Sequence, residues 1–251
     1  MQTRIYTLLK QRIAQNGSIF VFLIDPDKMN EQPIEDTLPR LAENGVDVIF
    51  IGGTLLLQQN FDEVVRKIKT AAGSLPVILF PGSVYQISAH ADALLFLSVI
   101  SGRNPAHLIE NQVLAAPIIW QKGIEPISCA YLLVESGQMT SAEFMSNSRP
   151  LPRNKPDLAL AHALAAEYLG FKLIYLEAGS GARLSVPEEM ITAVSHAVSL
   201  PVIVGGGIRT PEEAAKKSRA GASLVVVGNY FENGQNLNKI KEFAEAIHQR
   251  K

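Results

Sequence analysis

The feature that most constrains the fold is an alternation of short apolar runs with amphipathic stretches along the 251 residues. Eight runs are nearly continuous in Val, Ile and Leu, as expected of parallel strands buried on both faces. They occupy residues 18–25, 47–54, 76–83, 93–101, 125–135, 172–180, 201–208 and 222–229. Eight strands, each followed by a connection, predict an α/β fold, a single-domain (β/α)8 TIM barrel spanning residues 1–251.

A doubly wound open sheet is the alternative fold, and two small domains are the alternative organisation. An open sheet usually carries a Gly-rich fingerprint directly after its first strand. Here the first run ends in Asp25-Pro-Asp-Lys28, and the glycines cluster late in the chain. No linker, repeat or low-complexity tract divides the sequence, so one barrel is favoured.

The connecting stretches carry helix signals. Residues 61–73 and 157–170 show helical spacing and end in Gly, a usual helix stop. Residues 185–188 (SVPE) and 210–213 (TPEE) each fit a capping box. Residues 236–250 predict a closing amphipathic helix. Residues 84–91 are short for a helix, so the third helix of the barrel is expected to be short or missing.

One long stretch, residues 136–154, shows no regular pattern and follows the fifth predicted strand. A loop of this length inside a compact domain is usually mobile or functional. It should rise from the catalytic face, where it is a candidate lid.

Composition excludes several function classes. The chain has 23 Lys and Arg against 24 Asp and Glu, which argues against a general nucleic-acid binder. Cys129 is the only cysteine, so the chain alone can hold neither an internal disulfide nor a zinc ribbon. No apolar run approaches the ~20 residues needed to span a bilayer. The N-terminus lacks a signal-peptide core, so we expect a cytoplasmic protein, which can still work at a membrane surface.

Glycines at the ends of the last two predicted strands suggest a phosphate site. Gly205, Gly206 and Gly207 follow the seventh strand, and Gly228 with Asn229 follows the eighth. Glycine lets an anion approach backbone N–H groups, and many barrels bind phosphate with the loops after these two strands. A short helix within residues 231–238 would add its dipole. Alternatively, the glycines only permit tight turns.

The sixth predicted strand ends in residues 175–181 (YLEAGSG). Tyr175 and Glu177 share one face of a strand, whereas Leu176 lies on the other. With Leu176 toward the helices, both polar side chains face the barrel interior near its mouth. A carboxylate there costs several kcal/mol unless it is paired or used. We interpret Glu177 as catalytic or ligand-binding; the alternative is a Glu satisfied by an internal Arg or Lys.

The first predicted strand ends at Asp25, and Pro26 holds that residue in extended geometry at the strand tip. An Asp over the barrel mouth suits Mg²⁺, which takes few protein oxygens and leaves the remainder to water and phosphate. The Thr54 hydroxyl at the end of the second strand would be a near neighbour. A helix N-cap or a salt bridge to Lys28 explains Asp25 equally well. Asp27 and Lys28 are interpreted as turn and surface residues.

Taken together, five motifs resemble the geranylgeranylglyceryl phosphate synthase family of prenyltransferase TIM barrels. They fall in order at the ends of strands one, two, six, seven and eight, and so extend over most of the chain. They are residues 22–28 (FLIDPDK), 50–54 (FIGGT), 175–182 (YLEAGSGA), 204–209 (VGGGIR) and 227–229 (VGN). The late glycines are common in phosphate barrels, whereas the DPDK, YLEAGSG and GGGIR set in this order is specific.

The resemblance implies transfer of a prenyl group from geranylgeranyl diphosphate to the 3-hydroxyl of sn-glycerol 1-phosphate, with release of diphosphate. It implies Mg²⁺ held by Asp25 and Thr54, and it implies catalysis by Glu177 and Tyr175, with Glu177 accepting the hydroxyl proton. The glycerol phosphate site carries over to Tyr175, Leu176, Glu177, Ala178, Gly179, Ser180, Gly181, Gly206, Gly207, Gly228 and Asn229. The partners expected are these two substrates, a membrane surface contacted transiently, and further copies of the chain in a homo-oligomer.

The chain departs from part of the family at two motifs. Some members carry a Lys two residues before the first motif Asp, where this chain has Leu23, so the resemblance does not carry that phosphate contact over to this chain. Some read YLEYSG where this chain reads YLEAGSG, as in the branch that takes geranylgeranyl diphosphate. The alternatives are a longer donor such as heptaprenyl diphosphate, a phosphate-binding barrel of another reaction class, and a barrel that only binds a phosphorylated metabolite.

Overall fold

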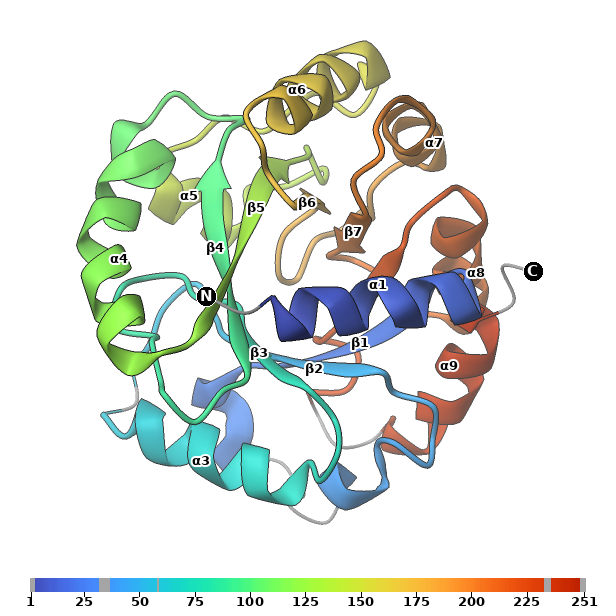
Figure 1. Cartoon of the computed structure of the whole chain (residues 1–251). Coiled ribbons are helices and arrows are strands. Elements are labelled where there is room, and N and C mark those ends of the chain that lie inside the picture. Colours follow the sequence, from blue (N-terminus) through green and yellow to red (C-terminus); the bar gives the residue numbers. More distant parts are fainter. Residues whose placement is uncertain (1–2, 32–36, 58, 233–235, 249–251) are drawn as a thin grey trace.

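A closed barrel of eight parallel strands, paired in chain order, forms the centre of the computed structural model (Figure 1). The structure describes residues 3–31, 37–57, 59–232 and 236–248. Each strand lies inside its predicted run, so the predicted barrel is confirmed. The strands are β1 (Ile19–Ile24), β2 (Val48–Ile51), β3 (Val77–Leu79), β4 (Ala93–Val99), β5 (Glu125–Leu133), β6 (Leu173–Glu177), β7 (Val202–Gly205) and β8 (Leu224–Val227).

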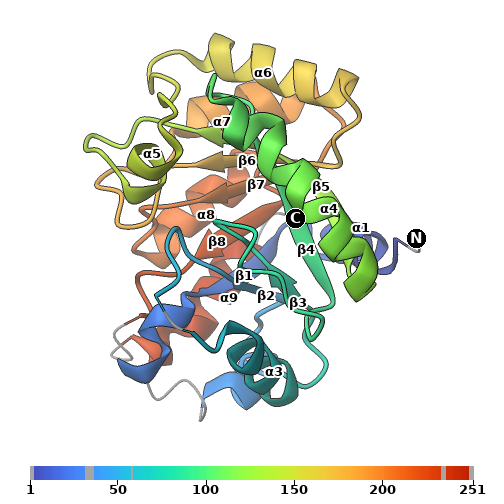
Figure 2. The ribbon, with the colours of Figure 1, turned by 90° about the vertical axis from the view of Figure 1, so that its left-hand side faces the viewer.

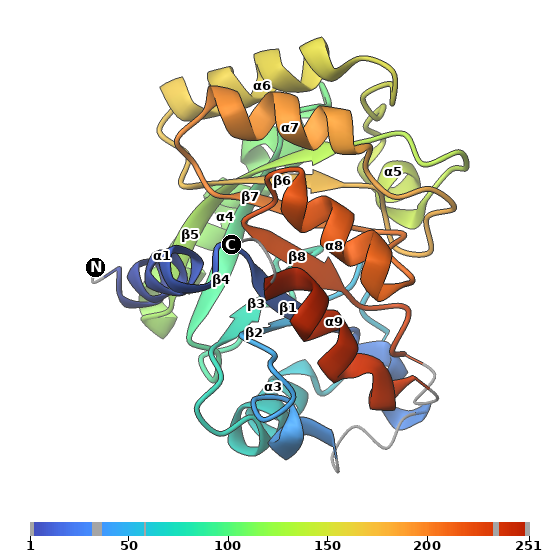
Figure 3. The ribbon, with the colours of Figure 1, turned by 90° about the vertical axis from the view of Figure 1, so that its right-hand side faces the viewer.

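Helices surround the barrel, and α6 to α9 cover one side of its wall (Figure 3). The helices are α1 (Arg4–Asn16), α3 (Phe61–Ala71), α4 (Asn111–Lys122), α5 (Ser141–Ser146), α6 (Pro156–Tyr168), α7 (Glu188–Ala197), α8 (Pro211–Arg219) and α9 (Ile240–His248). Short 3₁₀ turns span Pro26–Glu31, Leu38–Arg40 and Leu237–Lys239, and a π turn spans Ala106–Glu110. None of the described helices is long and apolar enough to cross a membrane.

The strand alternation separates two apolar layers. Along β6, Ile174 and Leu176 pack in the layer between strands and helices, while Leu173 and Tyr175 belong to the barrel interior. Because side chains alternate along a strand, Glu177 falls on the same face as Tyr175. The predicted inward orientation of the two polar side chains is therefore confirmed.

Three local predictions gave mixed results. No helix forms within residues 84–91, as predicted. Thr210 caps α8 by accepting a hydrogen bond from the Glu213 N–H at 3.2 Å, which confirms that capping box. The prediction of a capping box at Ser185 is wrong. The helix begins at Glu188 with Pro187 as its extended N-cap, because a proline disfavours helical geometry in the residue before it and so excludes a start at Ser185.

One loop prediction also needs correction. Residues 136–154 are not structureless, because they contain α5 and a bridge between Val134 and Leu151. Thr140 caps α5 by accepting from the Glu143 N–H at 3.3 Å, a Thr-x-x-Glu signal present in the sequence. In residues 231–238 a 3₁₀ turn begins at Leu237 and leads into α9. Residues 233–235 and 249–250 lie outside the described residues.

Helix α1 lies across the end of the barrel where the strands begin (Figure 1). Thr3 makes no side-chain cap at its N-terminus. The buried Glu125 carboxylate of β5 supplies the acceptors instead, binding the N–H groups of Ile5 at 2.8 Å and Tyr6 at 3.0 Å. Negative charge at a helix N-terminus is also favoured by the helix dipole. Glu125 therefore fastens α1 across this end.

We expect Glu125→Ala to lower the free energy of unfolding by about 1–3 kcal/mol, because two buried N–H groups lose their acceptor. Chemical denaturation measures the change. The control is Glu245→Ala, which removes only an exposed pair with Lys241. That control should stay within about 0.5 kcal/mol of the parent. Equal stability of the two variants would contradict the assigned role of Glu125.

Candidate active site

A cavity of about 1330 Å³ opens where the strands end. This is the end at which barrel enzymes place their chemistry. In Figure 2, α5 and the loops after β2 and β3 lie at this end and α1 lies at the other. Ten of the predicted site residues line the cavity: Asp25, Thr54, Tyr175, Glu177, Ser180, Gly181, Gly206, Gly207, Gly228 and Asn229. Leu176, Ala178 and Gly179 do not. Leu176 packs in the outer apolar layer.

Glu177 is buried at the base of this cavity, with 5% of its surface exposed. Its Oε1 accepts a hydrogen bond from the Gly179 N–H at 2.6 Å. Among the described residues no Lys, Arg or His forms an ion pair with it, so the alternative of an internal cationic partner is not supported. Burial raises the pKa of Glu177 to about 7, against the opposing effects of the Gly179 N–H and the Tyr175 hydroxyl.

Tyr175 lies beside Glu177 in an aromatic cluster inside the barrel. Its ring stacks on Phe80, with centroids 5.2 Å apart, and meets Tyr131 edge to face at 5.3 Å. Burial, followed by the charge of Glu177, raises the pKa of Tyr175 well above its usual value. The hydroxyl is therefore neutral. It lies close enough to Glu177 to affect that carboxylate, yet it has no hydrogen-bond partner of acceptable geometry among the described residues.

The glycines after β7 leave room for these groups. A Cβ atom at Gly205 would lie 2.5 Å from the Tyr175 Oη atom. At Gly206 the backbone has a φ of 85°, and a Cβ atom would lie 2.5 Å from the Glu177 Oε1 atom. Position 206 requires glycine, because its left-handed backbone disfavours other residues and a Cβ atom would also lie 2.6 Å from the Gly179 backbone nitrogen. A side chain at position 205 would force the Tyr175 hydroxyl to move.

Glu213 of α8 fixes the glycine loop against the loop after β6. Its Oε1 accepts from the Ser185 hydroxyl, and its Oε2 accepts from the Arg209 N–H at 3.0 Å. The Arg209 guanidinium in turn donates to the Ala182 carbonyl at 2.9 Å. The backbone N–H groups offered by both loops are therefore held in one arrangement before a ligand arrives.

A second network joins the loops after β6, β8 and β1. Asn229 Oδ1 accepts from the Ser180 hydroxyl at 3.1 Å and the Gly181 N–H at 3.3 Å. Its Nδ2 donates to Glu232 Oε2 at 3.0 Å, and Lys28 Nζ donates to the same oxygen at 2.7 Å. Three loops that would bind the substrates are thus connected by hydrogen bonds.

Lys28 corrects a prediction, because it is not an ordinary surface residue. It is partly buried, lines the cavity and lies 3.5 Å from Asp25 Oδ2 as well as 2.7 Å from Glu232. Burial lowers its pKa, but the hydrogen bond and charge of Glu232 outweigh that effect and raise it overall. Sequence reasoning also missed Glu232. The only available signal was its place in the loop after β8.

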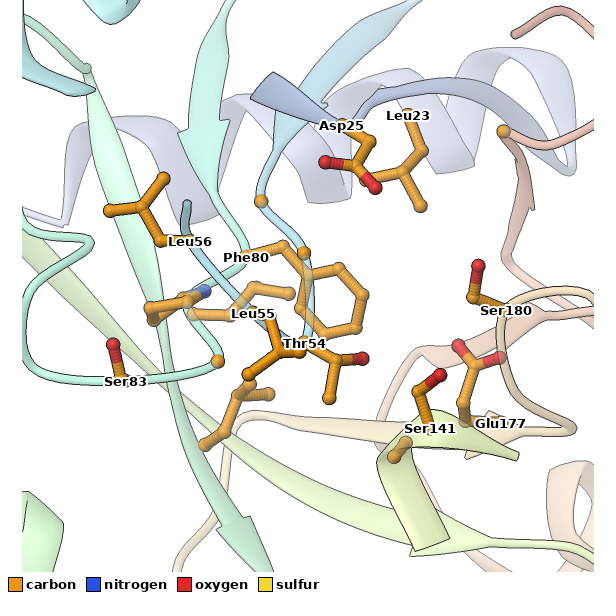
Figure 4. A pocket seen from close by; sticks show the side chains of 18 of the residues that line it. Leu23, Asp25, Thr54, Leu55, Leu56, Phe80, Ser83, Ser141, Glu177 and Ser180 are labelled. Atoms are coloured by element: carbon orange, nitrogen blue, oxygen red, sulfur yellow. The ribbon is translucent and has the colours of Figure 1, made fainter. Parts of the chain in front are cut away.

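Asp25 and Thr54 both line the cavity, and Figure 4 shows the Asp25 and Glu177 carboxylates turned into it. Asp25 Oδ1 accepts from the Asp27 N–H at 3.1 Å at the start of the 3₁₀ turn Pro26–Glu31, and Asp25 Oδ2 lies 3.5 Å from Lys28 Nζ. Both alternatives given for Asp25, a cap and a salt bridge, therefore occur. Next to it, Gly53 has no side chain to cover the carboxylate. One carboxylate and one hydroxyl are hard oxygen donors that suit Mg²⁺. No group of three acidic, His or Cys side chains suited to a metal occurs among the described residues.

From this mouth the cavity continues to the outer face of β4, between α3 and α4. No helix follows β3 there, in the described connection between β3 and β4. Figure 2 shows the loop after β3 in place of a helix on this side. We call this part of the cavity the apolar groove. It is lined by Phe61, Ile87, Leu94, Phe96 and Ala115. The site therefore combines a polar, glycine-rich mouth with an apolar groove.

The sequence matches a known protein family over most of its length. The model of the PcrB family matches residues 9–247. The chain belongs to the PcrB family. It is 46% identical over 248 residues to the geranylgeranylglyceryl phosphate synthase of Chitinophaga pinensis, covering 99% of this chain and 97% of that protein. It is 41% identical over 241 residues to the synthase of Korarchaeum cryptofilum, covering 95% and 98%.

A solved structure of a protein with the same name as these relatives matches the fold of this chain. The crystal structure of (S)-3-O-geranylgeranylglyceryl phosphate synthase from Thermoplasma acidophilum in complex with sn-glycerol-1-phosphate superposes with a TM-score of 0.88. It is 33% identical, covering 99% of this chain and 100% of that one. The resemblance inferred from the motifs is therefore confirmed, and this PcrB chain is an enzyme of the prenyltransferase class.

The departure at Leu23 has a local consequence in this PcrB chain. A Cβ atom at Gly228 would lie 3.1 Å from Leu23 Cδ2, so the Leu side chain packs beside the predicted phosphate loop and brings no charge to it. Lys28, five residues further on, is the cation of this segment that lines the cavity.

We expect Glu177→Gln to stabilise the fold at high pH. The carboxylate is harder to ionise in the folded chain, where its pKa is about 7, than in the unfolded chain, where it is about 4.5. Stability present at low pH is thus lost as pH rises from 4.5 through 7. Denaturation at pH 8 should show the variant more stable by about 3 kcal/mol, with no difference near pH 4. An equal difference at both pH values would contradict the shifted pKa.

Proposed function

We propose that this chain joins sn-glycerol 1-phosphate, through its 3-hydroxyl, to geranylgeranyl diphosphate, giving geranylgeranylglyceryl phosphate and diphosphate in a Mg²⁺-dependent reaction. The observation that carries the proposal is the position of Glu177. This buried carboxylate, which forms no ion pair within the described part of the chain, lies between glycine-rich loops suited to a phosphate and a groove suited to an apolar chain. The named relatives support the same reaction.

The phosphate of the acceptor is assigned to the loops after β6, β7 and β8. Gly206, Gly207 and Gly228 line the cavity and bring backbone N–H groups within reach of an anion. Ser180 and Asn229 add polar groups from two of these loops. The Thermoplasma acidophilum synthase was crystallised with sn-glycerol-1-phosphate, which supports this compound as the acceptor.

Glu177 is assigned as the base that takes the proton of the attacking hydroxyl. As the glycerol oxygen forms its bond to C1 of the donor, the bond between C1 and the diphosphate oxygen breaks and the proton passes to Glu177. A base whose pKa is about 7 is matched to this task near neutral pH. Tyr175, neutral and in contact with the same site, is assigned to position that carboxylate.

Asp25 and Thr54 are the residues that would hold Mg²⁺. When bound, the ion offsets the negative charge that develops on the departing diphosphate. The two residues would supply one carboxylate and one hydroxyl, hard oxygen donors of the kind that Mg²⁺ prefers. Lys28, 3.5 Å from Asp25, adds a second positive charge at the same place.

The apolar groove between α3 and α4 is assigned to the prenyl chain. A second candidate function is the same reaction with a longer donor such as heptaprenyl diphosphate, because His107 and Gln112 also line the cavity beside the apolar groove. Location in the cytoplasm and assembly into a homo-oligomer stay predictions.

The test is incubation of the protein with Mg²⁺, labelled sn-glycerol 1-phosphate and a series of prenyl diphosphates of increasing length. Label should pass into the lipid-soluble fraction, with geranylgeranyl diphosphate the best donor. A maximum at a longer chain would favour the second candidate. Absence of lipid-soluble label with every donor would contradict both.

Glu177→Gln should lower kcat by about a hundredfold to ten-thousandfold, because the amide cannot accept the proton. Binding of glycerol phosphate should change little, because the amide oxygen can still accept the Gly179 N–H. Calorimetry measures binding, and single-turnover kinetics measures the chemical step. Loss of binding in proportion to loss of rate would make Glu177 a binding residue only.

Asp25→Asn should abolish the response of the reaction rate to Mg²⁺, because the amide is a much weaker ligand for a hard cation. Asp27→Asn is the matched control, since Asp27 Oδ2 accepts from the Leu57 N–H at 2.8 Å in the adjacent turn. The control should keep the Mg²⁺ titration of the parent. A parent-like titration in Asp25→Asn would contradict the metal assignment.

A further inference from the structure

Large apolar side chains are exposed on two adjacent loops beside the cavity. Leu57 is 79% exposed in the loop after β2, and Tyr85 is 81% exposed in the loop after β3. Leu55, also exposed, accompanies them, and all three line the cavity at its open edge. We call these three residues the apolar rim. Isolated exposed apolar residues are ordinary, but a group around an entrance marks a contact surface.

The loops that carry the apolar rim hold no charged residue. Residues 52–60 and 81–89 contain no Asp, Glu, Lys or Arg. At the start of α3, Glu63 forms an ion pair with Arg66 at 2.6 Å, and Asp62 Oδ2 lies 3.3 Å from His90 Nε2. Asp27, in the turn after β1, touches this edge, because its Oδ2 accepts the Leu57 N–H at 2.8 Å. Shallow insertion of the rim side chains, with Asp27 at the level of the headgroups, would therefore bury no charge of these two loops, and burial of charge is the main cost of such a transfer.

Basic residues collect on the neighbouring loops of the same end. Residues 100–105, 134–155 and 178–187 together carry five basic residues and two acidic ones. Arg103 and Arg149 are exposed, and neither forms an ion pair among the described residues. Their loops touch, because Asn104 Nδ2 donates to the Ser146 carbonyl at 2.7 Å. An uncharged apolar edge beside a basic surface is complementary to a bilayer with anionic headgroups.

We propose that the apolar rim, with Arg103 and Arg149, docks this end of the barrel onto the surface of an anionic phospholipid bilayer. The inference rests on the proposed function in one respect, namely that the donor and the product are lipids. A prenyl chain could then pass between the bilayer and the apolar groove without crossing water. A protein partner seated on the same residues would instead cover the entrance to the cavity.

Flotation with vesicles, in the absence of either substrate, tests the proposal. The protein should bind vesicles of phosphatidylcholine mixed equally with phosphatidylglycerol, and bind less to phosphatidylcholine alone. The double variant Leu57→Ser with Tyr85→Ser should lose about tenfold in vesicle binding, because two inserted side chains are removed. Arg103→Gln with Arg149→Gln should lose the preference for the anionic vesicles.

A matched control exists at the opposite end of the barrel. Tyr168 and Leu169, at the end of α6, are 82% and 73% exposed and lie where the strands begin. Tyr168→Ser with Leu169→Ser should bind vesicles like the parent. Equal loss in both double variants would overturn the proposal, as would parent-like binding by either the rim or the arginine variant. A rim variant that breaks an oligomer in size-exclusion chromatography would assign the rim to a protein interface and overturn it too.

The two failures are distinguishable. A parent protein that binds no vesicle overturns the docking proposal, whereas the proposed reaction is tested separately with donor in detergent solution. Vesicle binding by a protein that shows no turnover with any donor would overturn the proposed function and leave the docking result standing.

Discussion

The burial of one carboxylate inside an apolar barrel is the constraint on which the rest of the site depends. Glu177 stays inside because its Oε1 accepts the Gly179 N–H, while the apolar surroundings raise its pKa to about 7. The same burial demands glycine at position 206, where a Cβ atom would approach that oxygen to 2.5 Å. The glycine that admits the carboxylate also exposes the backbone to an anion, so the base and the phosphate site arise from one packing requirement.

The missing helix after β3 links the fold to the choice of substrate. A complete barrel would cover the outer face of β4 there, and Leu94 and Phe96 would be closed in. Without it, these side chains line a groove continuous with the polar mouth. One omission therefore gives a phosphate-binding barrel room for an apolar chain, and the uncharged loops beside it bring that chain to a lipid surface.

Much of this was predictable from sequence. Strand alternation placed Tyr175 and Glu177 inward, and runs of Val, Ile and Leu placed all eight strands. The errors came from competing local effects. Pro187 prevents a helix start at Ser185 despite the capping signal there. In residues 136–154, which show no regular sequence pattern, the Thr140 hydroxyl accepts the Glu143 N–H and caps α5. Lys28 looked like a surface residue because its partner, Glu232, lies far away in the sequence, and only the closure of β8 onto β1 brings them together.

The most direct test of the account is the titration of Glu177 itself. Glutamate labelled with carbon-13 at Cδ gives one resonance for this residue, assigned by its loss in Glu177→Gln, and its shift can be followed with pH in the absence of substrate. The account predicts a midpoint near pH 7, set by burial in the barrel. A midpoint near 4.5, the ordinary value for glutamate, would contradict it, because the carboxylate would then be too weak a base at neutral pH.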